Sequence, residues 1–326
     1  MSVAIQSKAP SGTPSAEKGS SLWSDAFTRL KKNKLAILGG IVVAVILFAC
    51  FIVTPILSWR GMDANTQDLT NQFAKPGEGS LLGTDQLGRN MLMRVLEGGQ
   101  ISLLVAILST LLTVTIGIVY GGIAGYVGGK TEAIMMRIVD GLLAMPFLII
   151  VILFRELIAA RTDLVAAWLV ANWGFSSDLV LRFSNLIPLI FAIAAFGWLT
   201  MGRIVRTAAA SLRRQEFVEA ARSLGLPHHR ILFRHILPNM LGPVIIYATL
   251  TIPSFILYEA TLSFIGLGIE PPNSSWGILI KEGANFLETY PIVLAIPAIL
   301  FSVTLFAFNF LGDGLRDALD PKSSKD

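Results

Sequence analysis

A few ionisable side chains lie within or near long apolar stretches, and they are the first candidates for chemistry. Asp140 and Glu259 are the carboxylic acids among them, and Arg137 precedes Asp140 by three residues. Because a charged side chain is costly in lipid, such residues usually face a partner or a water-filled path. Arg137 and Asp140 can pair on one helix face, whereas Glu259 has no obvious local partner. Asp140 and Glu259 are therefore candidates for a substrate path, with stabilisation of neighbouring helices as the alternative.

A basic segment, residues 203–239, holds a second set of candidates, with seven arginines and all three histidines of the chain. Ser211 can cap a short helix there, Gly225 suits the left-handed position that ends a helix, and Pro227 prevents its continuation. The apolar residues that gather on one face of this helix are Phe217, Ala221 and Leu224, with Val218 beside them. The pattern predicts a short amphipathic helix, a sharp turn and a second helical stretch over about 228–237.

Other kinds of chemistry find no support in the residue pattern. The three histidines lack the spacing and the carboxylate neighbours of a metal site. The single cysteine, Cys50, sits in an apolar run, which favours plain packing. The chain has no G-x-x-x-x-G-K-[ST] phosphate loop, and its arginines flank apolar runs as they do in membrane proteins rather than in nucleic-acid-binding proteins. We therefore expect no metal, no cofactor, no catalytic residue and no nucleic acid.

The apolar runs themselves indicate a membrane protein. Of the 326 residues, 53% are hydrophobic and only 15% are charged, whereas soluble proteins usually carry about 25% charged residues. Backbone groups in lipid must pair within their own segment, so runs long enough to cross a core of about 30 Å should be helices. The expected spans are residues 35–57, 101–127, 138–154, 186–204, 241–267 and 291–311. The predicted fold class is thus an all-α integral membrane protein with six transmembrane helices.

The basic residues set the expected orientation. Eighteen of the 26 lysines and arginines lie in the two terminal segments and in alternate loops, and the positive-inside rule assigns those parts to the cytoplasm. With six spans, both termini lie inside. The expected parts are a cytoplasmic tail over 1–34, a first transmembrane helix over 35–57, a periplasmic loop over 58–100, a core over 101–311 that includes the basic loop, and a cytoplasmic tail over 312–326.

Glycines recur every four residues near the end of the second span, at Gly117, Gly121, Gly125 and Gly129. This spacing places them on one stripe of a helix, where the missing side chains let another helix backbone come very close. We expect tight packing there, within this subunit or against a second one. A hinge for a gating motion is the alternative.

Several motifs resemble those of a known family, the permease subunits of ABC importers. The basic segment carries the EAA signature of that family as Glu219-Ala220-Ala221, Gly225 and Leu237-Pro238. The outer-loop motif of the dipeptide, oligopeptide and nickel branch is similar to Leu82-Gly83-Thr84-Asp85 with Leu87-Gly88-Arg89. Residues 262–268 also resemble a motif of this branch, and the tail over 308–321 is similar to the C-type permease of the same branch. A basic amphipathic loop alone would be typical of a membrane-surface element, but these motifs occur in the family's order.

The resemblance implies a type I ABC importer permease fold, a transport function without catalysis, and a set of partners. In that family the EAA loop forms a coupling helix that docks in a cleft of the ATPase. The coupling residues would be Phe217, Glu219, Ala220, Ala221, Leu224 and Gly225. The implied partners are a homologous second permease, two ATPase subunits and a periplasmic substrate-binding protein, in the bacterial inner membrane. Di- or oligopeptides are the expected cargo, and nickel chelates, opines and oligosaccharides are alternatives.

A proton-coupled secondary transporter is the main rival in function. It would need buried acidic relays near the midplane and usually internal repeats. The chain offers only Asp140 and Glu259 for such a relay and no convincing repeat.

Residues 155–185 depart from the family pattern. An apolar piece over 164–175 is flanked by charged residues, and twelve residues of helix reach only about 18 Å, too short to cross a bilayer core. We expect an interfacial or re-entrant helix on the outer face, near the place where a binding protein docks. A lipid-facing insertion without a role in transport is the alternative.

Overall fold

The computed structural model describes residues 22–78, 80–174, 176–270 and 273–319, and these parts are almost entirely helical. The N-terminal helices are α1 (Leu22–Leu30), α2 (Lys34–Phe48), the π-helix η1 (Ala49–Val53) and α3 (Thr54–Trp59). A short 3₁₀ turn, η2 (Leu69–Asn71), precedes α4 (Met91–Val127), α5 (Gly129–Leu143), α6 (Phe147–Trp173), α7 (Ser177–Ser184) and α8 (Ile187–Leu212). The remaining elements are α9 (Glu216–Ser223), α10 (His228–Ile231), η3 (Leu232–Ile236), α11 (Leu237–Asn239), α12 (Leu241–Phe264), α13 (Trp276–Ala284) and α14 (Pro291–Leu319).

The number of spans agrees with the expected fold class. Within the described residues, five helical segments are long and apolar enough to cross a membrane: 34–59, α4, α8, α12 and α14. A sixth is formed by α5 and α6 together, which are bent by 93° at the break between them. The prediction of an all-α membrane protein with six crossings is confirmed if the bent pair counts as one span.

The second and third predicted spans differ most from the structure. The second begins at Met91 rather than at residue 101, because Asn90 caps α4 through a bond from the Met93 amide. The prediction that the third span is one continuous helix over 138–154 is wrong. Pro146 lacks an amide hydrogen and its ring excludes the helical conformation of the residue before it, so the chain breaks and α6 starts at Phe147.

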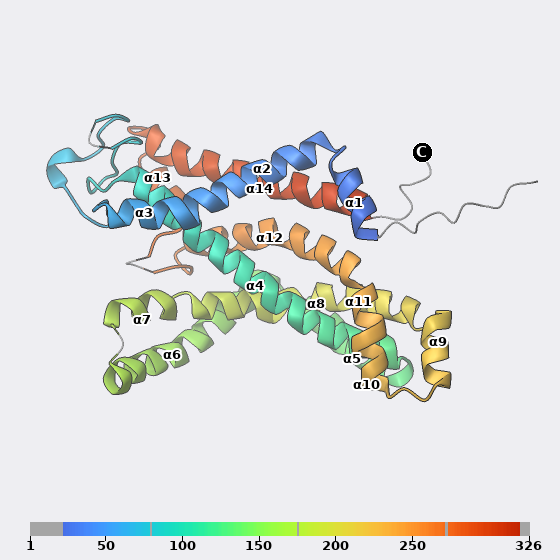
Figure 1. Ribbon diagram of the computed structural model, residues 1–326. Helices are drawn as coiled ribbons and strands as arrows, with labels where there is room; N and C mark the ends of the chain where they lie inside the picture. Colours follow the sequence, from blue (N-terminus) through green and yellow to red (C-terminus); the bar gives the residue numbers. More distant parts are fainter. Residues whose placement is uncertain (1–21, 79, 175, 271–272, 320–326) are drawn as a thin grey trace, which may run out of the picture.

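The helices run between two ends of the molecule (Figure 1). At one end lie α1, α9, α10, the start of α5 and the C-terminal end of α14. At the other end lie α3, α7, α13 and the outer segment, by which we mean residues 60–90. In the middle, α4 packs along α8, α14 packs against α2 and α12, and α6 packs on α8.

The glycine stripe packs α4 against α8 within this chain. A Cβ atom built on Gly121 would lie 2.3 Å from the carbonyl oxygen of Gly202, and one on Gly125 would lie 2.3 Å from that of Arg206. At Gly117 the clash would be with the side chain of Met201. Gly129 does not belong to the stripe, because it follows the end of α4 at a φ of +61° and faces open space. The predicted stripe therefore has three members, and they bring two helix backbones together.

A larger side chain in the stripe is expected to separate α4 from α8. The change Gly121→Leu should lower the stability of the purified protein by more than the 1–3 kcal/mol that is typical of overpacking, because backbone atoms rather than flexible side chains face the glycine. Gly242→Leu is the matched control, since a Cβ atom at Gly242 meets nothing within 4 Å. Thermal unfolding in detergent measures both, and equal midpoints would contradict the assigned packing.

Candidate coupling surface and outer ion-pair cluster

Helix α9 is a well-defined short helix at the end of the molecule that also holds α1 and α10 (Figure 1). Gln215 precedes it in an extended conformation, and Glu216 and Glu219 lie in its first turn, where negative charge complements the helix dipole. It ends in a Schellman turn, in which the Gly225 amide bonds to Arg222 and the Leu226 amide to Ala221. Gly225 has a φ of +72°, as predicted.

The start of this helix was predicted wrongly. Ser211 does not cap it, because α8 continues through Ser211 to Leu212 and α9 begins only at Glu216. The apolar residues that precede Ser211 continue the pattern of the spanning helix, so a serine near its end is not a starting signal. The turn at residues 213–215 therefore separates α8 from α9.

One side of α9 is buried in this chain and the other is exposed. Val218 is fully buried and Ala221 is 4% exposed, and both pack in a cluster with Met201, Val205 and Ile231. The expected common face of Phe217, Ala221 and Leu224 is thus wrong, since Leu224 is 80% exposed while Ala221 faces its own subunit. Of the six predicted coupling residues, the five that are exposed are Phe217, Glu219, Ala220, Leu224 and Gly225, and we call them the α9 surface.

The last turn of α4 holds α9 and α10 in place through Tyr126. The guanidinium carbon of Arg222 lies 5.4 Å from the centre of the Tyr126 ring, and the Tyr126 hydroxyl is 2.8 Å from Nδ1 of His228. Arg213, just after α8, donates to the carbonyl oxygens of Tyr126 and Val127 at 3.2 and 3.0 Å. The α9 surface is therefore attached to the ends of the two helices that the glycine stripe joins.

Two ion pairs connect α5 to α8. Asp140 pairs with Arg203 and Glu132 pairs with Arg206, so the expected partner of Asp140, Arg137, is not the one in the structure. Both members of the first pair are exposed, and exposed pairs stabilise a protein little. The three-residue spacing permitted the pairing with Arg137, but the carboxylate of Asp140 also lies within reach of Arg203 on the neighbouring helix.

Glu259 is fully buried and joins three helices. It accepts hydrogen bonds from Ser102 on α4 and from Ser263 on its own helix, α12, both at 2.7 Å. The Ser102 oxygen in turn accepts a bond from the Trp276 amide of α13 at 3.2 Å. These contacts favour the helix-stabilising alternative for Glu259, and the sequence could not identify the partners because Ser102 lies 157 residues away.

A second polar centre lies in the outer segment, where the motif around Asp85 forms an ion-pair cluster. The Asp85 carboxylate accepts from the Arg89 Nε at 2.7 Å and from Arg94 at 2.6 Å. Its other oxygen accepts from the amides of Leu87 and Arg89. Glu282 on α13 completes the cluster by pairing with Arg94 at 2.6 Å and with Arg89 at 3.3 Å. Asp85 and Arg94 are almost completely buried.

The glycines of the outer motif allow this segment to fold back on itself. Gly83 and Gly88 have φ values of +79° and +70°, and a Cβ atom on Gly88 would lie only 1.8 Å from the carbonyl oxygen of Asp68. The motif is therefore a close-packed turn whose aspartate anchors it to α4 and α13. Residue spacing could not reveal Arg94 and Glu282 as members of the cluster, because neither belongs to the motif.

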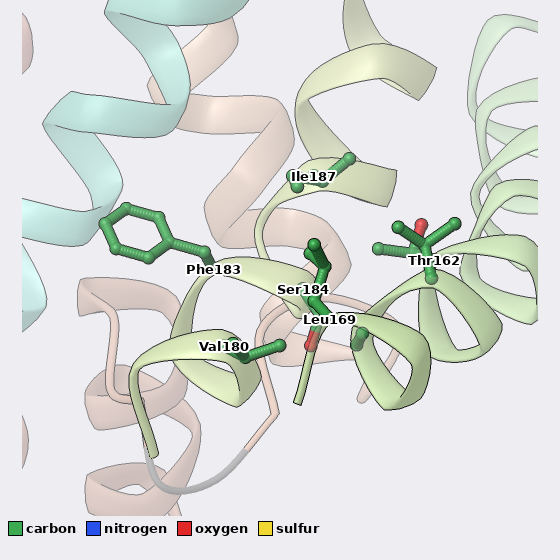
Figure 2. A pocket seen from close by; sticks show the side chains of 8 residues that line it. Thr162, Leu169, Val180, Phe183, Ser184 and Ile187 are labelled. Carbon is green, nitrogen blue, oxygen red and sulfur yellow. The ribbon is translucent and has the colours of Figure 1, made fainter. Parts of the chain in front are cut away.

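The segment over 155–185 forms a helical hairpin. We expected its apolar piece to form a separate short helix. In the structure this piece is instead the last part of the 27-residue α6. Arg155 anchors this helix by bonding to Glu156, to Glu270 and to the carbonyl oxygen of Gly268. An open pocket of ≈ 420 Å³ lies between α6, α7 and the start of α8, and Figure 2 shows side chains that line it. Its lining is mainly aliphatic, so it offers little to orient a polar substrate.

Comparison with known proteins places these features in a family. Residues 117–325 match the family described as binding-protein-dependent transport system inner membrane component. The chain belongs to this family. Residues 21–76 also match the N-terminal transmembrane domain of oligopeptide transport permease C, so both halves of the chain agree with the resemblance that the motifs indicated.

Relatives in this inner-membrane component family cover almost the whole chain. The oligopeptide transport system permease protein OppC of Haemophilus influenzae is 42% identical over 94% of this chain and 90% of its own length. The protein of the same name in Salmonella typhimurium is 44% identical over 94% and 93%. The dipeptide transport system permease protein DppC of Bacillus subtilis is 39% identical over 91% and 85%. The chain is therefore a multi-pass inner-membrane permease of this family.

The ion-pair cluster is expected to hold the outer segment on the helices. The change Asp85→Asn leaves Arg89 and Arg94 with one carboxylate between them, and breaking a buried pair typically costs about 3–5 kcal/mol. Asp63→Asn is the matched control, because Asp63 is an exposed carboxylate of the same segment. Limited proteolysis between residues 60 and 90 should speed up for Asp85→Asn alone. Equal cleavage rates for the two variants would show that the cluster does not fix the segment.

Proposed function

We propose that the chain is one permease subunit of an ATP-driven importer that carries di- or oligopeptides across the bacterial inner membrane. The observation that carries this proposal is the similarity, over more than nine tenths of the chain, to permeases whose names state oligopeptide or dipeptide transport. Nickel chelates, opines and oligosaccharides stay as alternative cargoes of the same kind of permease. A labelled tripeptide, offered to cells with and without the gene for this chain, tests the proposal, and equal uptake by both would contradict it.

The proposed transporter contains three kinds of partner. A homologous second permease faces this chain across the path, two ATPase subunits supply the energy, and a periplasmic substrate-binding protein delivers the cargo. ATP hydrolysis is assigned to the separate ATPase, so this subunit is not catalytic. The path alternates between an inward-open and an outward-open state, and the closed ATPase pair favours one of them.

The α9 surface is the proposed docking site for the ATPase. Phe217 and Leu224 offer apolar contacts, Glu219 offers a charge, and Ala220 permits close approach. Because Arg222 of α9 lies over the Tyr126 ring of α4 and Val218 packs in one cluster with Met201 and Val205 of α8, a displacement of α9 would move these helices with it. Ala221 acts in a different way from the expected one, since its small side chain lets α9 lie close to its own subunit.

The orientation follows from the position of α9. If the ATPase binds at α9, the end of the molecule that holds α1 and the C-terminal end of α14 is cytoplasmic, and both termini lie inside (Figure 1). The outer segment, α7 and α13 then face the periplasm, where a binding protein delivers substrate. The dense positive charge of the segment over 203–239 supports this orientation.

A proton-coupled transporter finds little support as an alternative function. The two acids available for a proton relay are both engaged, Asp140 with Arg203 and Glu259 with two serines. Such a transporter would also have no use for an exposed helix of the α9 kind.

Bulk on the exposed side of α9 is expected to prevent docking. In Ala220→Trp an indole at a close contact should cost about 1–3 kcal/mol, which weakens association roughly five- to hundredfold. Co-purification of the ATPase with the tagged permease measures the effect. Leu81→Trp is the control, because Leu81 is also exposed but lies in the outer segment. Undiminished recovery of ATPase with Ala220→Trp would remove α9 as the docking site.

A further inference from the structure

A second cavity, of ≈ 290 Å³, lies beside the break between α5 and α6. It borders the middle of α8 and of α12, and both ends of the break, Leu143 and Phe147, belong to its lining. Side chains with hydroxyl groups and aromatic rings make up most of the rest: Phe196, Thr200, Tyr247, Thr251, Ser254, Phe255 and Tyr258. We call this cavity the hydroxyl pocket. None of the functions assigned above uses it.

The polarity of the hydroxyl pocket argues that it does not face lipid. Thr200 and Ser254 are exposed although they lie near the middle of spanning helices. The Thr251 hydroxyl donates to the Tyr247 carbonyl oxygen at 2.7 Å. On α2, by contrast, the exposed mid-span side chains are apolar, as at Ile41 and Val45. A helix face with exposed hydroxyl groups is better suited to contact with protein or with a water-filled path than to contact with lipid.

The helix break supplies a second, independent observation. Pro146 precedes α6 and no side chain caps the start of the helix, so the first amide groups of this helix have no acceptor within the helix. Irregular backbone at membrane depth is tolerated where it is buried in protein or lines a water-filled cavity. The residues of the break itself, Ala144 to Pro146, are exposed in this subunit. The break therefore adds backbone donors to the edge of the hydroxyl pocket.

We propose that the hydroxyl pocket is the place where this subunit contacts the main chain of a peptide in transit, an inference that rests on the proposed function. Each peptide unit offers one donor and one acceptor, and hydroxyl groups can both donate and accept. None of the residues that line the pocket is charged, so it holds no fixed charge that would select for or against charged side chains of the cargo. Neutral hydrogen bonds are also weak enough to release the peptide. In this proposal the hydroxyl pocket, rather than Asp140 and Glu259, lines the substrate path.

Solvent access is tested first, in the assembled transporter reconstituted into vesicles. In a Cys50→Ser background, Ser254→Cys should react with a membrane-impermeant, positively charged thiol reagent, and a saturating tripeptide should slow the reaction. Val45→Cys is the control, because Val45 is also exposed in this subunit but lies on α2, where the exposed mid-span side chains are apolar. No reaction at either site would mean that lipid or a helix of the second permease covers the pocket, and the proposal would be overturned.

Transport is tested next, with changes that remove hydroxyl groups or fill the pocket. Thr200→Val and Ser254→Leu should lower tripeptide uptake about three- to tenfold, the factor expected from losing one neutral hydrogen bond, without changing the amount of ATPase bound. Thr249→Val is the control, since Thr249 is on α12 outside the lining and bonds to its own helix. Normal uptake in both pocket variants overturns the proposal and leaves the proposed function intact. A wild-type transporter without peptide uptake overturns both.

Discussion

The close contact of α4 with α8 is the constraint on which the rest of this structure depends. In lipid, helices gain little from burying apolar surface, so their association relies on close van der Waals packing. Gly121 and Gly125 let the α4 backbone touch carbonyl groups of α8, which no larger residue would permit. This contact fixes where the two helices end, and the polar features of the protein are built at those ends and beside them.

At one end, the fixed helix ends provide a platform for α9. The carbonyl groups that α4 leaves unpaired at its C-terminus are bonded by Arg213, as positive groups at helix C-termini commonly do. Tyr126 then contacts both Arg222 and His228. If the docking segment were a loop with only flexible connections to the spanning helices, a movement of the bound ATPase would not reach those helices. A helix that packs on the ends of two spanning helices transmits that motion to them.

Sequence reasoning found the parts of this protein that depend on local physics. Long apolar runs, the glycine spacing and the Gly225 turn follow from residues close together in the chain, and the structure contains all three. It failed where a residue had several partners within reach. Asp140 pairs with Arg203 rather than with Arg137. Arg94 and Glu282, which lie outside the motif, belong to the same ion-pair cluster as Asp85. The break at Pro146 was available in the sequence, but the hydropathy of residues 138–154 concealed it.

The placement of charge in this fold explains why a neutral pocket suits its middle. The buried ionisable groups of the ion-pair cluster and Glu259 are each ion-paired or hydrogen-bonded to neighbours that hold elements together. A free charge at mid-membrane depth would bind an oppositely charged cargo tightly and repel the rest. Peptides share only their main chain, and a permease that must pass many sequences gains from contacts to that shared part. Hydroxyl groups beside an open helix end provide such contacts at a low cost of desolvation.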